Sequence, residues 1–159
     1  MPHVTIEYVI MLPVLLMQVF LFPLAAAWLM NVWVDSRRTL AVQDVASHLG
    51  STLQQLYFSL NHETMSSGKA TYSPGLPPYI EDCPYYANGT LRTVSGQQGA
   101  SKVLDLMVRL ISTKISVTTT VMLGSNVQWQ TSTFMSNSTH AAVSALKQAD
   151  GNITLYFGE

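Results

Sequence analysis

Few side chains in this chain of 159 residues have the types and spacing that catalysis or metal binding requires. His62-Glu63 resembles the start of a zinc-binding helix, but Ser66 stands where that motif needs its second histidine. Ser95-Gly-Gln-Gln-Gly99 is glycine-rich but lacks the Lys-Ser/Thr pair of a phosphate loop. The acidic pair Glu81-Asp82 lies in a Pro-rich loop and is interpreted as a solvated turn. We therefore expect no catalytic residues, no metal, no cofactor and no enzymatic activity.

The composition limits the classes of partner. The formal net charge is −1 and charged residues make up 11% of the chain, so nucleic-acid binding has no electrostatic basis. Cys83 is the only cysteine, which excludes an intrachain disulfide and a zinc site built on cysteines. Two interpretations of Cys83 stay open, a buried small apolar group and an intermolecular bridge in a filament.

Three N-x-[ST] triplets begin at Asn88, Asn137 and Asn152. Such triplets are acceptors for N-glycans on exposed loops of exterior proteins. Together they predict that these three asparagines lie on exposed loops or strand ends of a glycosylated domain outside the cell.

The element that must position any such domain is an apolar run from Tyr8 to Val34, interrupted only by the polar residues Gln18 and Asn31. A bilayer core of about 30 Å takes roughly 20 helical residues, so this run is long enough to span it. Apolar residues then recur at three- and four-residue spacing as far as Leu60, which is typical of an amphipathic helix. We expect one helix from about Val4 to Asn61, with two internal prolines that bend it or loosen a turn.

The remainder of the chain predicts a β-rich domain. Residues 62–99 form a Pro/Gly-rich entry loop with short strands, in which Asn88-Gly89 is typical of a two-residue hairpin. Residues 103–110 alternate like a strand, although the same residues also fit an amphipathic helix. Residues 115–123, 127–134 and 153–157 are strand-like, with turns at 124–125 and 150–151. The predicted fold class is α+β, a long N-terminal helix (1–61) followed by a small antiparallel β-sandwich or barrel-like domain (62–159).

One signal conflicts with an exterior domain. Arg37 and Arg38 follow the apolar run and no Lys or Arg precedes it, so the positive-inside rule places that end in the cytoplasm. The three triplets and the β-rich composition favour the exterior. A start codon further upstream, with a basic leader, would remove the conflict.

The first residues carry a family resemblance. His3-Val-Thr-Ile-Glu-Tyr8, followed by the apolar helix, resembles the start of archaeal type IV pilin-like proteins with class III signal peptides. In that family a polar residue begins the mature chain, a Ser or Thr follows two residues later and a Glu two residues after that, often before an aromatic residue. His3, Thr5, Glu7 and Tyr8 fill these places, although only Met1-Pro2 stands where the family has a longer basic leader.

The resemblance implies a structural subunit, major or minor, of an extracellular type IV pilus-like filament that serves adhesion or surface attachment. The helix would lie in the membrane before assembly and then pack with other copies or other pilin subunits. Glu7 would neutralise the amino terminus of a neighbouring helix. The alternative is a monomeric cell-surface protein, anchored by one transmembrane helix, with a β-rich binding domain.

Overall fold

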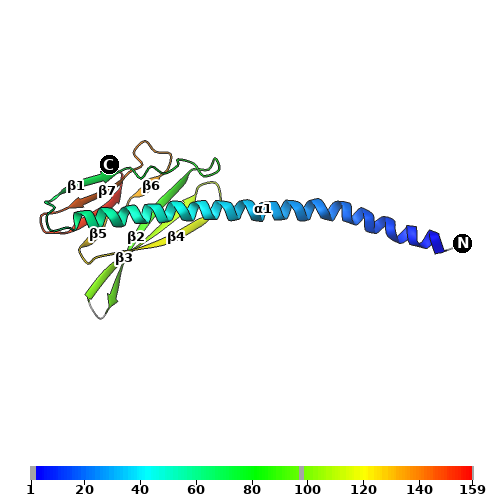
Figure 1. Cartoon of the computed structure of the whole chain (residues 1–159), viewed down its shortest axis with the longest axis horizontal. Coiled ribbons are helices and arrows are strands. Elements are labelled where there is room, and N and C mark those ends of the chain that lie inside the picture. Colours follow the sequence, from blue (N-terminus) through cyan, green and yellow to red (C-terminus); the bar gives the residue numbers. More distant parts are fainter. Residues whose placement is uncertain (1–2, 97–98, 159) are drawn as a thin grey trace. The chain divides into compact units, whose positions relative to one another are not determined.

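The computed structural model describes residues 3–96 and 99–158, and the side chains of residues 3–8, 10, 95–96 and 99–100 lie outside this description. A single helix, α1 (His3–Leu60), is followed by β-strands (Figure 1). The predicted helix bounds agree with α1 to within one residue. α1 continues through Pro13 and Pro23. The predicted α+β fold class is confirmed.

The chain divides into two compact units, Met1–Arg37 and Arg38–Glu159. The division falls inside α1 because its N-terminal part has no other element of its own unit to pack on, whereas its C-terminal part packs on the strands. The boundary predicted at residue 61 follows the elements, while this division follows the packing.

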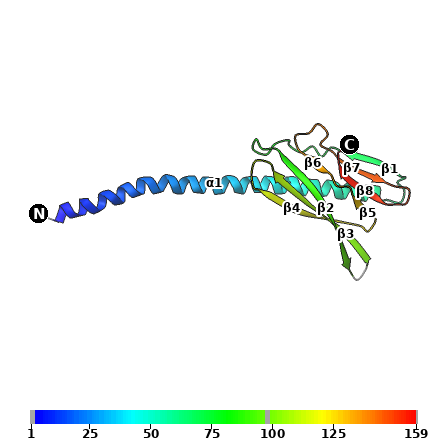
Figure 2. The same cartoon turned by 180° about the vertical axis from the view of Figure 1, so that it is seen from behind.

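The strands of the second unit form two sheets, visible from opposite sides in Figures 1 and 2. One sheet has the order β1-β7-β8-β5 and the other β4-β3-β2-β6. Neighbouring strands are antiparallel except β5 and β8, which pair in parallel. In the described residues the strands are β1 (Gly68–Tyr72), β2 (Tyr85–Gly96), β3 (Gly99–Leu110), β4 (Ser116–Leu123), β5 (Val127–Trp129), β6 (Thr133–Met135), β7 (Val143–Lys147) and β8 (Ile153–Phe157).

One hydrophobic core joins both sheets to the C-terminal part of α1. The apolar stripe of the helix is buried, with Leu49 and Leu53 fully inaccessible to solvent. In β3 the alternating residues Leu104, Leu106 and Val108 are fully buried in the same core, so the strand interpretation of this segment is confirmed. The pattern of period two places one face of the strand inward.

A polar network fixes the end of α1 on this core. The Tyr57 hydroxyl donates to Asn126 Oδ1 at 3.0 Å. Asn126 Nδ2 donates in turn to Asn61 Oδ1 and to the Gly151 carbonyl, both at 2.9 Å. Asn126 therefore ties the last turn of the helix to two loops. Turns were predicted at both loops and are present.

The predicted hairpin at Asn88-Gly89 is wrong. Both residues lie in the middle of β2, opposite Met107 and Leu106 of β3. A glycine is required at position 89 because the Trp129 ring packs against its backbone. A Cβ there would lie 2.5 Å from the ring. A glycine inside a strand often marks such an approach.

The two-residue turn of this region is at Glu81-Asp82. Ile80 and Cys83 exchange backbone hydrogen bonds of 2.9 and 3.0 Å across it. Glu81 and Asp82 have φ values of 45° and 62°, the left-handed geometry of a type I′ turn that normally favours Asn-Gly. Cys83 is half-buried and is a free thiol.

The run predicted as one strand over residues 127–134 is two short strands in different sheets. β5 pairs with β8 in one sheet, and β6 pairs with β2 in the other. Residues 130–132 carry the chain from one sheet to the other. Alternation of apolar residues gives the inward face of a strand but not the sheet to which it belongs.

Candidate assembly surface

The N-terminal part of α1 exposes apolar side chains in every direction. We call residues 9–34 the apolar stretch. Most of its large apolar residues are about half or more exposed, between 48% at Val32 and 75% at Phe22, whereas Val34 at its C-terminal end is half-buried. Successive helical residues are rotated by about 100°, so the consecutive exposed residues from Leu12 to Phe22 cover the whole circumference. Exposed apolar area of this extent is unfavourable in water, so the apolar stretch needs a hydrophobic environment that the described residues of its own unit do not supply.

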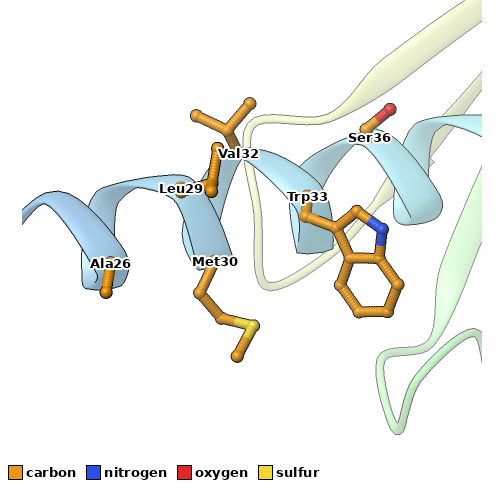
Figure 3. Close-up of a pocket in the computed structure, with 6 residues that line it drawn as sticks. All are labelled: Ala26, Leu29, Met30, Val32, Trp33 and Ser36. Atoms are coloured by element: carbon orange, nitrogen blue, oxygen red, sulfur yellow. The ribbon is translucent and has the colours of Figure 1, made fainter.

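α1 passes the length and composition requirement for crossing a membrane, which makes the apolar stretch a possible membrane anchor. Among the described residues of its unit, no other element packs around it. The hollow in Figure 3 illustrates this, because all its lining residues project from one helix: Ala26, Leu29, Met30, Val32, Trp33 and Ser36. In that view Met30 and Trp33 project from one side of the helix, whereas Val32 and Ser36 project from the other.

The C-terminal end of the apolar stretch carries an aromatic–cation pair. The Arg37 guanidinium lies 4.9 Å from the centre of the Trp33 ring, one helical turn earlier. An arginine over an indole face is attracted by the ring quadrupole. Tryptophan with a nearby basic residue is typical of the boundary between membrane and water. The sequence signal was an aromatic residue four positions before an arginine on a predicted helix, a spacing that brings the two side chains together.

The next residue fixes the start of the second unit. Arg38 Nε donates to Glu81 Oε2 at 2.9 Å. This pair connects α1 to the left-handed turn at Glu81-Asp82. From the sequence, Arg38 is only a topology signal and Glu81 is only part of a solvated turn, because a contact between residues so far apart in the chain leaves no local pattern.

The residues that carry the family resemblance lie at the first turns of α1. His3, Thr5, Glu7 and Tyr8 are helical, and their side chains lie outside the described residues. The roles inferred for these four residues stay predictions.

The three predicted glycosylation residues have different surroundings. Asn137 is exposed in the turn after β6. Asn152 is half-buried directly before β8, and its Nδ2 donates to Asp150 Oδ2 at 2.6 Å. Asn88 lies within β2 with strands on both sides. The prediction that all three occupy exposed loops or strand ends is therefore wrong for Asn88.

The charged groups of the second unit sit on its surface, away from the core. Arg92 hydrogen-bonds Asp105 and lowers the pKa of that carboxyl, which also accepts from Thr120 Oγ1 at 3.1 Å. Inside the core, burial raises the pKa of the Tyr85 hydroxyl to about 12. This hydroxyl donates to the Pro77 carbonyl at 2.8 Å. Among the described residues no cluster of three or more His, Cys, Asp or Glu side chains has the arrangement of a metal site.

Comparison with protein-family models, curated proteins and solved structures gives no match to this chain.

Proposed function

We propose that this protein is a structural, pilin-like subunit of an archaeal type IV pilus-like filament, assembled through the apolar stretch of α1. The observation that supports this most is the contrast within one helix. The apolar stretch is exposed on every face, while the C-terminal part of the same helix buries its stripe against the β-sheets. Such a chain would have one folded domain and one helix whose apolar surface is shielded from water only by other molecules.

The apolar stretch would be shielded from water in two successive environments, first the membrane and then the filament. In the membrane, lipid would surround the helix on all sides. In the filament, equivalent helices of neighbouring copies would replace the lipid, so that the apolar surface never enters water. The β-domain would then lie outside the helix bundle, with a role in adhesion or surface attachment.

The alternative is a monomeric cell-surface protein held by one transmembrane helix. The Trp33–Arg37 pair favours it, because a membrane boundary explains that pair without any filament. Both proposals place the helix in the membrane at first. They differ in whether copies of the helix afterwards pack together outside it.

The test uses Glu7, which the family resemblance assigns to assembly. Its carboxylate would pair with the amino terminus of a neighbouring helix, an attraction of several kcal/mol only in surroundings of low dielectric. We expect Glu7→Ala to remove most of the chain from sheared surface filaments while the β-domain stays folded. Asp44→Ala is the matched control, since Asp44 is an exposed acid further along α1.

Filament content and the membrane-bound pool are both measured by immunoblot. Loss from filaments with an intact membrane pool for Glu7→Ala, and no change for Asp44→Ala, supports the filament subunit. Equal incorporation of both variants removes the role of Glu7. Absence of the wild-type chain from any sheared filament favours the anchored monomer.

A further inference from the structure

We infer that Asn137 is the one acceptor of an N-linked glycan in the folded protein. The fold makes the triplets at Asn88 and Asn152 inaccessible to the transferase. The inference rests on the proposed function in one respect, since it requires the β-domain to face the outside of the cell. It goes further by separating three triplets that the sequence presents as equivalent.

The chemistry sets the geometric requirement. The Asn Nδ2 forms a bond to the anomeric C1 of a sugar, and the bond between C1 and the phosphate oxygen of a lipid-linked oligosaccharide breaks. The lipid phosphate leaves with the electron pair, and the amide proton passes to a base of the transferase. The transferase must reach the asparagine and the Ser or Thr two residues later together, so all three residues have to be free to leave the protein surface.

The triplet at Asn137 meets this requirement. Asn137, Ser138 and Thr139 are all exposed and none belongs to a strand. The hydrogen bonds of the triplet are long and local: the Ser138 amide donates to the Met135 carbonyl at 3.1 Å, Ser138 Oγ accepts from the His140 amide at 3.2 Å, and the Ser138 carbonyl accepts from the Ala141 amide at 3.3 Å. Releasing such exposed hydrogen bonds costs little, since each contributes only about 0.5–1.5 kcal/mol net.

The loop that carries Asn137 is held at both ends, so the core stays folded when the triplet leaves the surface. Ser136 is buried, accepts from the Tyr85 amide at 3.0 Å and donates to the Pro78 carbonyl at 2.7 Å. Ala142 and Val143 are buried at the other end. A glycan on Asn137 therefore extends into solvent from a loop whose ends stay in place.

The triplet at Asn88 fails because it lies inside a sheet. Asn88 pairs with Met107 on one side and with Thr133 on the other. Its Oδ1 is buried and has no hydrogen-bond partner among the described residues. Releasing this triplet would separate β2 from two neighbouring strands and remove Trp129 from its contact with Gly89.

The triplet at Asn152 fails at its second and third residues. Ile153 and Thr154 belong to β8, which pairs with β7 on one side and β5 on the other. Ile153 is fully buried. The Asn152 side chain is also held by Asp150, through Nδ2 at 2.6 Å.

The test is glycan transfer to the purified full-length chain in detergent, with a single-subunit oligosaccharyltransferase that accepts N-x-[ST] and a lipid-linked oligosaccharide donor. Intact mass and peptide mapping then count and locate the glycans. We expect one glycan on the folded wild type, at Asn137, and none on Asn137→Gln or Thr139→Ala. Asn88→Gln and Asn152→Gln should each still accept one glycan at Asn137.

Synthetic peptides of the three triplets with their flanking residues serve as controls for sequence preference. We expect all three peptides to be glycosylated, which assigns the selectivity of the folded chain to its structure. Transfer to Asn88 or Asn152 in the folded chain, or none to Asn137, overturns the inference. Because this assay needs neither filament nor membrane topology, its outcome is independent of the Glu7 experiment that tests the proposed function.

Discussion

The two parts of α1 have the same secondary structure and opposite relations to the rest of the chain. The apolar stretch, residues 9–34, is apolar on all faces and exposed on all faces. Residues 42–60, which we call the amphipathic stretch, have one apolar stripe, and the β-sheets cover it. The comparison shows that an apolar helix surface is buried only where strands of the same chain pack against it. The described residues of its own unit do not cover the apolar stretch, and we propose that lipid and then other copies of the chain cover it.

The largest expected effect separates the two stretches directly. Leu53 is fully buried in the amphipathic stretch, whereas Leu16 is 53% exposed in the apolar stretch. We expect Leu53→Ala to lower the free energy of unfolding by about 2–5 kcal/mol, since it leaves a cavity in the core. Leu16→Ala in detergent should change it by less than about 0.5 kcal/mol.

Chemical denaturation measures both variants through Trp129 fluorescence, in a background with Trp28→Phe and Trp33→Phe. Similar losses of stability for Leu16→Ala and Leu53→Ala would break the comparison, because the apolar stretch would then be part of the folded core.

The next effect concerns the core beneath the amphipathic stretch and depends on pH. Burial raises the pKa of Tyr85 from 10.0 to about 12. An unfolded tyrosine ionises at the lower value, so this contribution to stability is complete below about pH 10. It is lost as pH rises toward 12, by about 3 kcal/mol in all. Tyr85→Phe should flatten this alkaline loss.

Absorbance titration of the phenolate checks the assignment. Tyr85 of the folded wild type should ionise with a pKa of about 12, and Tyr85→Phe should lack that late step. If the absorbance lost in Tyr85→Phe lay near pH 10 instead, Tyr85 would be accessible to solvent and the core would be looser than described.

A smaller effect tests the packing of the two sheets on each other. A Cβ at Gly89 would lie 2.5 Å from the Trp129 ring, so Gly89→Ala has to displace the indole. Overpacking of this kind costs about 1–3 kcal/mol. Gly68→Ala is the matched control in a strand, because nothing lies within 4 Å of its added Cβ. Denaturation midpoints of the two variants should differ clearly, and equal midpoints would contradict the close approach.

The smallest effect belongs to the charged surface of the β-domain. Arg92 lowers the pKa of Asp105, and its side-chain hydrogen bond to the carboxylate is the largest cause. A lowered carboxyl pKa contributes stability above the unfolded value of 3.8, and this is lost as pH falls through the folded pKa. Arg92→Ala should raise the Asp105 pKa in a carboxyl NMR titration with little change in the midpoint at neutral pH. No movement of that resonance would contradict the ion pair.

The sequence predicted the elements whose signals are local. Period 3.6 as far as Leu60 gave α1, and period two around Leu106 gave β3. The failures came from contacts between distant residues. Asn88-Gly89 is a hairpin signal by composition, but the glycine is there for Trp129, forty residues later. Glu81-Asp82 was predicted as a turn, and the structure has a turn there. Its left-handed geometry was not predicted, because Glu81 is not a residue that turn preferences favour in this region, whereas Asp82 tolerates it.

The candidate surface was predictable to the same degree. Continuous apolarity indicated that residues 8–34 need a hydrophobic environment. The structure adds that, among the described residues, no other element of their own unit supplies it. The Trp33–Arg37 pair follows from helical spacing. The difference in accessibility between the three asparagine triplets could not be predicted from the sequence. It depends on the pairing of Asn88 with β3 and β6, and of the residues after Asn152 with β5 and β7.

Cross-linking within filaments tests the central claim, that the apolar stretch is covered by other copies of this chain. A single cysteine is placed at Leu16 in a Cys83→Ser background, and sheared extracellular filaments are oxidised before denaturing electrophoresis. The account predicts disulfide-linked dimers of the chain in the filament fraction, absent from the Cys83→Ser background without the new cysteine. A chain confined to the membrane fraction and monomeric after oxidation would contradict it.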